Sequence, residues 1–92
     1  MLVQQVGMAS EAFALAWLKK MVPEAQWRQG TKWEDEVLKA DVVGEKDGMT
    51  CLVQVKSSYK AAMKFLFDNR NFKGRIIVVP VDGNAYLVDQ EA

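Results

Sequence analysis

The sequence predicts an α/β domain in which helices flank a mixed central β-sheet. Residues 8–22 show the apolar spacing of a helix. Asp47-Gly48 lies between two apolar runs, which is the strongest short signal for a β-hairpin. Residues 75–79 are almost wholly apolar, as is typical of a strand covered on both faces. The expected order is α-β-β-β-α-β-β, within one domain over residues 1–92.

The composition narrows the chemistry that this chain can perform. It contains no histidine and one cysteine, Cys51, so histidine-based catalysis and an internal disulfide framework are both excluded. Strand alternation turns Cys51 away from the face of Gln54, and we expect a small core residue there. The sequence has neither a basic leader nor a long apolar run, so we expect a cytoplasmic protein with no membrane association.

The first helix is expected to end at Pro23, which cannot continue it. One apolar stripe of this helix contains Leu15 and Leu18, and Glu11 lies in the middle of the stripe. A carboxylate there is costly unless a cation or hydrogen-bond donors meet it, and a metal ion or Lys56 would do so. The alternative is that Glu11 is a first-turn residue stabilised by the helix dipole and by water.

Three further segments lead from this helix to the hairpin. Residues 26–29 are expected to form a short edge strand. The three consecutive acidic residues 34–36 are interpreted as a solvated turn, and the alternative is that they are a second source of metal ligands. Residues 37–43 alternate well enough for a strand, and residues 49–55 are its expected hairpin partner.

The hairpin register places candidate functional residues opposite one another. With residues 47 and 48 as the turn, Asp41 lies opposite Gln54, and Lys39 lies opposite Lys56. Gln54 and Lys56 are two apart and share a face, so a carboxylate, an amide and an ammonium would converge within about 5 Å. Hard oxygen ligands beside a lysine suit Mg²⁺ and phosphodiester chemistry. The alternative is an ordinary strand face that carries polar residues because it is exposed to water.

Residues 56–75 form a basic segment, although the whole chain is neutral, with 12 Lys and Arg against 12 Asp and Glu. Residues 56–75 contain six Lys and Arg and a single acidic residue, Asp68. A serine-capped helix over residues 60–67 carries much of this charge. A phosphate backbone would lie on such a surface, and the alternative is an ordinary solvated helix face. A turn at residues 82–84 and a strand at residues 85–88 are expected to close the sheet.

The expected elements are, in order, a helix with Glu11, a strand with Asp41, a strand with Gln54-Val55-Lys56, a basic helix and a strand. This order resembles that of the PD-(D/E)XK nuclease superfamily. The resemblance is greatest to the small Holliday junction resolvases. Those proteins often begin with Gly-x-x-x-Glu on the first helix, and residues 7–11 fit that pattern.

Two departures from the superfamily pattern bear on activity. Ala40 stands where the superfamily has proline, and Gln54 replaces the usual acidic residue. Some superfamily members carry glutamine at that place and remain active. The loss of one negative charge should nevertheless weaken metal binding, so a catalytically weak or inactive copy is an open alternative.

The resemblance implies a restriction-endonuclease-like fold and a Mg²⁺- or Mn²⁺-dependent endodeoxyribonuclease that acts on branched or duplex DNA. It implies that Asp41, the Gln54 carbonyl oxygen and the Val55 backbone carbonyl bind the metal. Glu11 would complete the site directly or through water. Lys56 would orient or activate the attacking water and stabilise the developing charge. The residues expected to contact DNA are Lys39, Lys60, Lys64, Arg70 and Lys73.

Symmetrical cleavage of a junction requires two sites, so a homodimer is implied. A surplus of aromatic surface favours the same conclusion. The residues expected to supply it are Trp33, Phe65, Phe67 and Phe72. Two other functions are open. One is a non-catalytic DNA-binding module on the same scaffold, which Gln54 favours. The other is a small interaction protein whose residues 56–75 dock an acidic partner.

Overall fold

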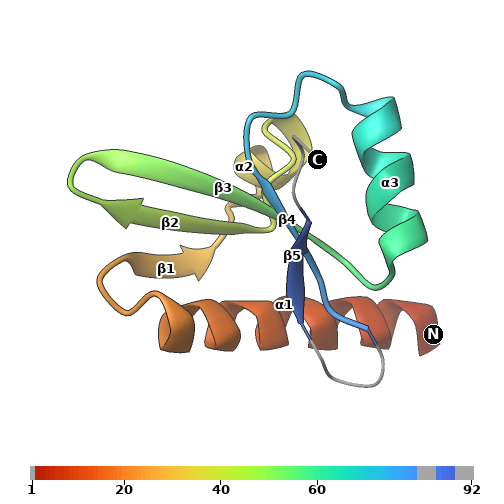
Figure 1. Ribbon diagram of the computed structural model, residues 1–92, viewed down its shortest axis with the longest axis horizontal. Helices are drawn as coiled ribbons and strands as arrows, with labels where there is room; N and C mark the ends of the chain where they lie inside the picture. The colour runs from red at the N-terminus through yellow and green to blue at the C-terminus, as the bar shows by residue number, and fades with distance from the viewer. Residues whose placement is uncertain (1, 81–84, 89–92) are drawn as a thin grey trace.

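The computed structural model describes residues 2–80 and 85–88, with side chains described from residue 10 onward. Within these residues, three helices accompany a five-stranded mixed sheet in the order β1-β2-β3-β4-β5 (Figure 1). Strands β3 and β4 are parallel, and the other neighbouring pairs are antiparallel. The elements are α1 (Leu2–Met21), β1 (Gln26–Gln29), α2 (Lys32–Val37), β2 (Val42–Lys46), β3 (Met49–Lys56), α3 (Tyr59–Asp68), β4 (Arg75–Val78) and β5 (Tyr86–Val88).

The two faces of the sheet carry separate apolar clusters. Helix α1 packs on one face, where Leu18 shares a buried cluster with Val53 and Val55 of β3. Helix α3 packs on the opposite face, where Phe65 shares a second cluster with Ile76 of β4 (Figure 1). Burial of these apolar side chains is the main force that holds the helices to the sheet. We call these two sides the α1 face and the α3 face of the sheet.

The predicted hairpin register is confirmed. Lys46 pairs with Met49, and Val42 pairs with Val53. The turn residues Asp47 and Gly48 have φ angles of 52° and 77°. A two-residue type I′ turn requires positive φ at both positions, and Asp-Gly meets that requirement at little cost.

The predicted strand over residues 37–43 is wrong in its first half. Val37 is instead the last residue of the short helix α2, residues 38–41 form the turn after it, and β2 begins at Val42. The side chain of Thr31 accepts a hydrogen bond from the Glu34 amide, and the Glu34 carboxylate accepts one from the Thr31 amide, which completes a capping box. Residues 34–36 are therefore helical and do not form a solvated turn, and the expected order α-β-β-β-α-β-β is wrong in lacking this helix between its first two strands.

Four further predictions concern helix α1, strands β1 and β4, and the turn at residues 82–84. Helix α1 begins at Leu2, well before the predicted start at residue 8, because residues 2–7 contain no proline and one glycine costs a long helix only about 1 kcal/mol. The edge strand at residues 26–29 is confirmed. Ile76 and Ile77 of β4 are both fully buried, which confirms a strand covered on both faces. The predicted turn at residues 82–84 lies outside the described residues.

The expected aromatic surface is only half present. Trp33 and Phe67 are exposed, at 60% and 69%. Phe65 is buried and packs edge-on against Phe72, with their ring centres 5.1 Å apart. These two rings belong to the α3 cluster because Phe65 lies on the face of the helix that meets β4. Cys51 packs against the α1 cluster, as expected for a core residue.

Candidate functional site

Asp41 lies where β2 and β3 separate. Its backbone amide donates to the Val53 carbonyl over 2.8 Å, and its Oδ2 accepts a hydrogen bond from the Val55 amide over 2.9 Å. The side chain thus takes the place of a backbone acceptor at the end of the ladder. This arrangement fixes the carboxyl against β3, one residue before the end of that strand.

Burial raises the pKa of Asp41 to about 7. The hydrogen bond from Val55 lowers the pKa, but a hydrogen bond shared with Asp35 and the negative charges of Glu11 and Asp35 raise it further. Asp41 is therefore a carboxyl that changes charge near neutral pH. Such a pKa is unusual for a structural aspartate and is typical of functional sites.

Glu11 reaches this place from α1. It lines a cavity of about 250 Å³ together with Leu15, Gln29 and Val42. Burial raises the pKa of Glu11, and the charge of Asp35 adds to that effect. Three carboxyl groups from α1, α2 and the start of β2 are therefore close enough to influence one another. We call Glu11, Asp35 and Asp41 the acidic cluster.

Gln54 is almost completely buried, and its Nε2 donates a hydrogen bond to the Lys39 carbonyl over 2.6 Å. Lys39 has a φ of 60°, in the left-handed region that non-glycine residues rarely adopt. The Gln54 amide thus stabilises the strained turn that joins α2 to β2. Lys39 lies in this turn and not opposite Lys56, because β2 begins only at Val42. The expected facing pair of lysines is absent for that reason.

Gln54 and Lys56 project from the α3 face of β3. In the parallel register they stand beside Ile76 and Val78, which belong to the α3 cluster. The ammonium of Lys56 lies 5.0 Å from the centre of the Phe65 ring, a cation–π contact. Val55, which lies between Gln54 and Lys56 in the strand, faces α1.

The four candidate residues therefore do not converge on one point. Glu11 and Asp41 gather with Asp35, whereas the side chains of Gln54 and Lys56 turn to the α3 face. The physical reason is the alternation of β3 together with the packing of α1. The strand directs Val53 and Val55 to the face that α1 covers, and Glu11 is on α1.

Backbone hydrogen bonds show which way the peptide groups of β3 point. The Lys56 carbonyl accepts from the Val79 amide over 2.8 Å, on the β4 side. In a strand, the amide and the carbonyl of one residue point to the same side, and those of the next residue point to the opposite side. The Val55 groups therefore point toward β2, where its amide meets Asp41. The Val55 carbonyl lies on the same edge of β3 as the Asp41 carboxylate.

The atoms near Asp41 that could bind a metal ion are carboxylate and carbonyl oxygens, which are the ligands that Mg²⁺ prefers. Among the residues that the structure describes, no three Cys, Asp or Glu side chains are arranged to hold a metal ion by themselves. Proteins usually bind Mg²⁺ through one or two carboxylates, with water and substrate phosphates as the remaining ligands. The Asp41 carboxylate and the Val55 carbonyl fit a site of that hydrated kind.

Asp35 is the one site residue whose position the sequence prediction missed. The neighbouring Glu34 has no free carboxylate, because it binds Arg28 at 2.6 Å and caps α2 through Thr31. The Thr-x-x-Glu pattern of that capping box was the available signal. It starts a helix at residue 32, and the helix brings Asp35 to Asp41.

The basic residues expected to contact DNA lie on α3, on the loop after it and, for Lys39, in the turn after α2. Lys64 is paired with Asp68 over 2.7 Å, and the Arg70 guanidinium lies 4.9 Å from the centre of the Phe67 ring. Lys60 is exposed on α3, and Lys73 is exposed just before β4. These four residues follow α3 and the loop after it.

No protein-family model, curated protein or solved structure matches this chain. In the described part of the chain, no helix is both long enough and apolar enough to cross a membrane.

Proposed function

We propose that this chain is a metal-dependent endodeoxyribonuclease with a restriction-endonuclease-like fold, acting on branched or duplex DNA. The observation that carries the proposal is the Asp41 carboxyl, which is held by the Val55 amide beside Glu11 and Asp35. Partial burial of an ionised acid among other acids is unfavourable unless a cation or a retained proton neutralises it. A divalent cation would convert this repulsion into attraction. The order of elements that resembles junction resolvases supports the same proposal.

In this proposal Asp41 and the Val55 carbonyl would hold Mg²⁺ or Mn²⁺, with Glu11 and Asp35 as neighbouring carboxylates. The ion, when bound, would lower the pKa of water and stabilise negative charge on the phosphate. The role of Asp41 is to orient that centre from the end of the hairpin, where the rigid β3 fixes its carboxylate. The Glu11 and Asp35 carboxylates would accept hydrogen bonds from the surrounding water.

Lys56 is assigned the role of charge partner to the scissile phosphate. It is the last residue of β3, directly after Val55. Its four-carbon stem is flexible, and the contact with Phe65 that it would give up is worth about 0.5–2 kcal/mol. Lys56 can therefore exchange the aromatic ring for a phosphate at small cost.

Gln54 is assigned a positioning role in place of metal ligation. Its amide nitrogen is held by the Lys39 carbonyl, and that contact fixes the turn from which Asp41 emerges. An amide cannot act as a general base. Gln54 thus affects the site through the position of Asp41.

A homodimer belongs to the same proposal, since symmetrical cleavage needs two sites. The exposed side chains of Trp33 and Phe67 are large apolar groups that an interface would cover. The basic residues of α3 would then join into one wider positive surface for DNA.

A non-catalytic DNA-binding module is the second candidate. It is favoured by two contacts, because Gln54 is engaged by Lys39 and Lys56 rests on Phe65. In that case the basic residues would bind phosphates, and the acidic cluster would have only a structural effect.

A cleavage assay separates the two candidates. The chain is incubated with a four-way junction and with a linear duplex, in Mg²⁺, in Mn²⁺ and in EDTA. The nuclease proposal requires cleavage with at least one metal and none in EDTA. Salt-dependent binding of both DNAs without cleavage in any metal would establish the binding module.

A further inference from the structure

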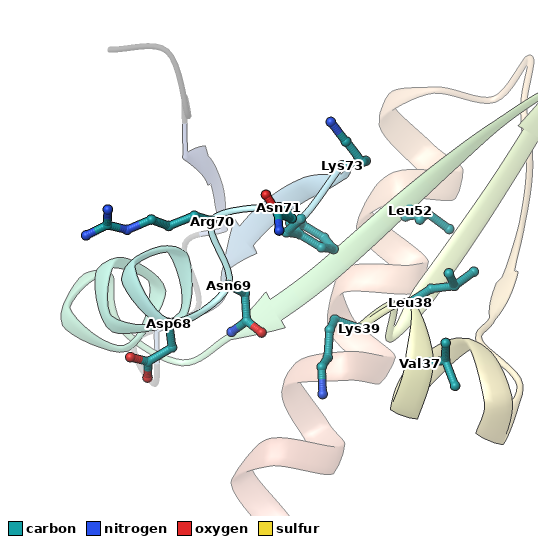
Figure 2. A pocket seen from close by; sticks show the side chains of 10 residues that line it. Val37, Leu38, Lys39, Leu52, Asp68, Asn69, Arg70, Asn71 and Lys73 are labelled. Atoms are coloured by element: carbon teal, nitrogen blue, oxygen red, sulfur yellow. The ribbon is translucent and has the colours of Figure 1, made fainter.

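A cavity of about 360 Å³ opens on the α3 face of the sheet, between the turn after α2 and the loop after α3. In Figure 2, Leu38 and Leu52 lie on one side of the opening, and Asn69 and Asn71 lie on the other. Phe72 also lines the cavity. One side is thus apolar and the other carries amide groups. We call this cavity the loop pocket.

The loop pocket is electropositive. Lys39 and Lys73 stand at opposite ends of the opening (Figure 2), and Arg70 also belongs to the lining. Asp68 is the acidic residue of the lining, and its carboxylate is neutralised by Lys64 at 2.7 Å. Within the described part of the chain, Lys39 and Lys73 form no ion pair. Positive charge at both ends of the opening suits a ligand that carries a phosphate on either side of an apolar body.

The polar groups of the loop pocket can read the edge of a planar ring. Asn69 donates through Nδ2 to the Phe65 carbonyl over 2.9 Å, which leaves its oxygen as an acceptor. Asn71 is exposed and offers both a donor and an acceptor. Leu52 and Phe72 provide apolar surface against which a ring can pack. A nucleobase combines such a ring with hydrogen-bonding edges, and phosphates flank it along the strand.

We propose that the loop pocket binds one unpaired nucleotide of a DNA strand. Bases of a fully paired duplex are stacked and cannot enter a cavity, whereas a bulged or displaced base can. The base would pack on Leu52 and Phe72, and Asn69 and Asn71 would contact its edge. Lys39 and Lys73 would contact the phosphates on its two sides.

The loop pocket adjoins the proposed active centre through Lys39. The Lys39 carbonyl binds Gln54, and the following residues lead directly to Asp41. This inference rests on the proposed function, because it takes DNA as the ligand. It adds that the protein recognises unpaired nucleotides and therefore selects branched or distorted DNA over regular duplex.

Binding can be measured without cleavage by fluorescence anisotropy in EDTA. Two probes are used, a short duplex and the same duplex with a single bulged thymine. The wild-type protein is expected to bind the bulged probe about tenfold more tightly, a ratio typical of a base held by a few contacts. Asn71→Ala should reduce that ratio about fivefold, as expected for loss of one hydrogen bond, and should leave affinity for the regular duplex unchanged. Lys73→Ala should weaken binding of both probes and lower the salt dependence.

Two matched controls test the assignment. Gln26→Ala removes an exposed amide on β1, and Lys19→Ala removes an exposed lysine on α1. Gln26→Ala should leave the ratio of affinities unchanged, and so should Lys19→Ala. Equal affinity of the wild type for both probes would overturn the inference and leave the proposed nuclease standing. Binding of neither probe would overturn both. Displacement of the bulged probe by an oligoglutamate peptide, but not by oligothymidine, would assign the loop pocket to an acidic partner and also overturn the inference.

Discussion

Gln54 Nε2 donates a hydrogen bond to the Lys39 carbonyl over 2.6 Å, and this contact ties the middle of β3 to the turn that precedes Asp41. Lys39 has a φ of 60°, which costs a non-glycine residue about 1–2 kcal/mol. The buried amide of Gln54 compensates for that cost by satisfying the carbonyl. Position 54 therefore needs a side chain that donates a hydrogen bond.

The first prediction concerns this donor. Gln54→Glu replaces the donor by a carboxylate that faces the Lys39 carbonyl, so we expect a loss of about 1–3 kcal/mol in the free energy of unfolding. Urea unfolding at neutral pH measures it. Gln26→Glu makes the same change on the exposed edge strand and should have little effect. If Gln54→Glu is as stable as the wild type, the hydrogen bond to Lys39 does not maintain the turn.

The second prediction concerns pH. The pKa of Asp41 is raised to about 7 from an ordinary value near 3.8, so the folded state retains a proton that the unfolded state releases. The stabilisation is complete below the unfolded pKa and is lost as the pH rises through the folded pKa. We expect the free energy of unfolding in EDTA to fall by about 1–2 kcal/mol between pH 5 and pH 8, after allowance for solvent screening of a partly exposed group.

Asp41→Asn supplies the control for this pH dependence. An asparagine does not titrate, so the slope between pH 5 and pH 8 should largely disappear in the variant. Added Mg²⁺ should reduce the slope in the wild type, because a bound cation favours the ionised carboxylate. An equal slope in the wild type and in Asp41→Asn would remove Asp41 as its source.

The third prediction separates chemistry from binding at Lys56. Removal of a charge partner in the transition state typically lowers the rate about 10²–10³-fold. DNA affinity is spread over many phosphate contacts, so Lys56→Ala should change it only slightly. Gel shifts and single-turnover cleavage measure the two quantities, and Lys46→Ala in the hairpin is the matched control. Equal cleavage by Lys56→Ala and the wild type would exclude Lys56 from the mechanism.

The fourth prediction concerns assembly. Trp33 and Phe67 are exposed aromatic residues that an interface would cover, so we expect a dimer at micromolar concentration by sedimentation. Trp33→Ser or Phe67→Ser should shift the equilibrium toward the monomer. A wild-type monomer that cuts both strands of a junction in one binding event would show that the symmetry argument is wrong.

The sequence predicts the local features of this fold well. Asp-Gly dictates its turn through the backbone, so the register from Val42 to Met49 follows from two residues. The apolar run at β4 dictates a strand buried on both faces. Helix α2 follows from a capping box, a local signal that the alternating pattern of residues 37–43 obscures. These features depend on neighbours in the sequence.

The arrangement of the site depends on contacts between distant residues. Lys39 adopts a left-handed conformation directly after the C-cap of α2, a common way to end a helix, and its carbonyl is bound by Gln54 from 15 residues further along the chain. The choice of face for Gln54 and Lys56 depends on which helix packs on which side of β3, and strand alternation alone leaves that choice open. The meeting of Asp35 with Asp41 depends on both of these features.

The most direct test of the nuclease proposal is cleavage of a four-way junction in Mg²⁺ and in Mn²⁺ by the wild type, by Asp41→Asn and by Asp47→Asn. Asp47 lies in the exposed turn of the hairpin, so Asp47→Asn makes the same chemical change away from the site. We expect cleavage by the wild type and by Asp47→Asn, and a rate about 10²–10³-fold lower for Asp41→Asn. Equal cleavage by all three proteins, or no cleavage by the folded wild type in either metal, would contradict the nuclease proposal.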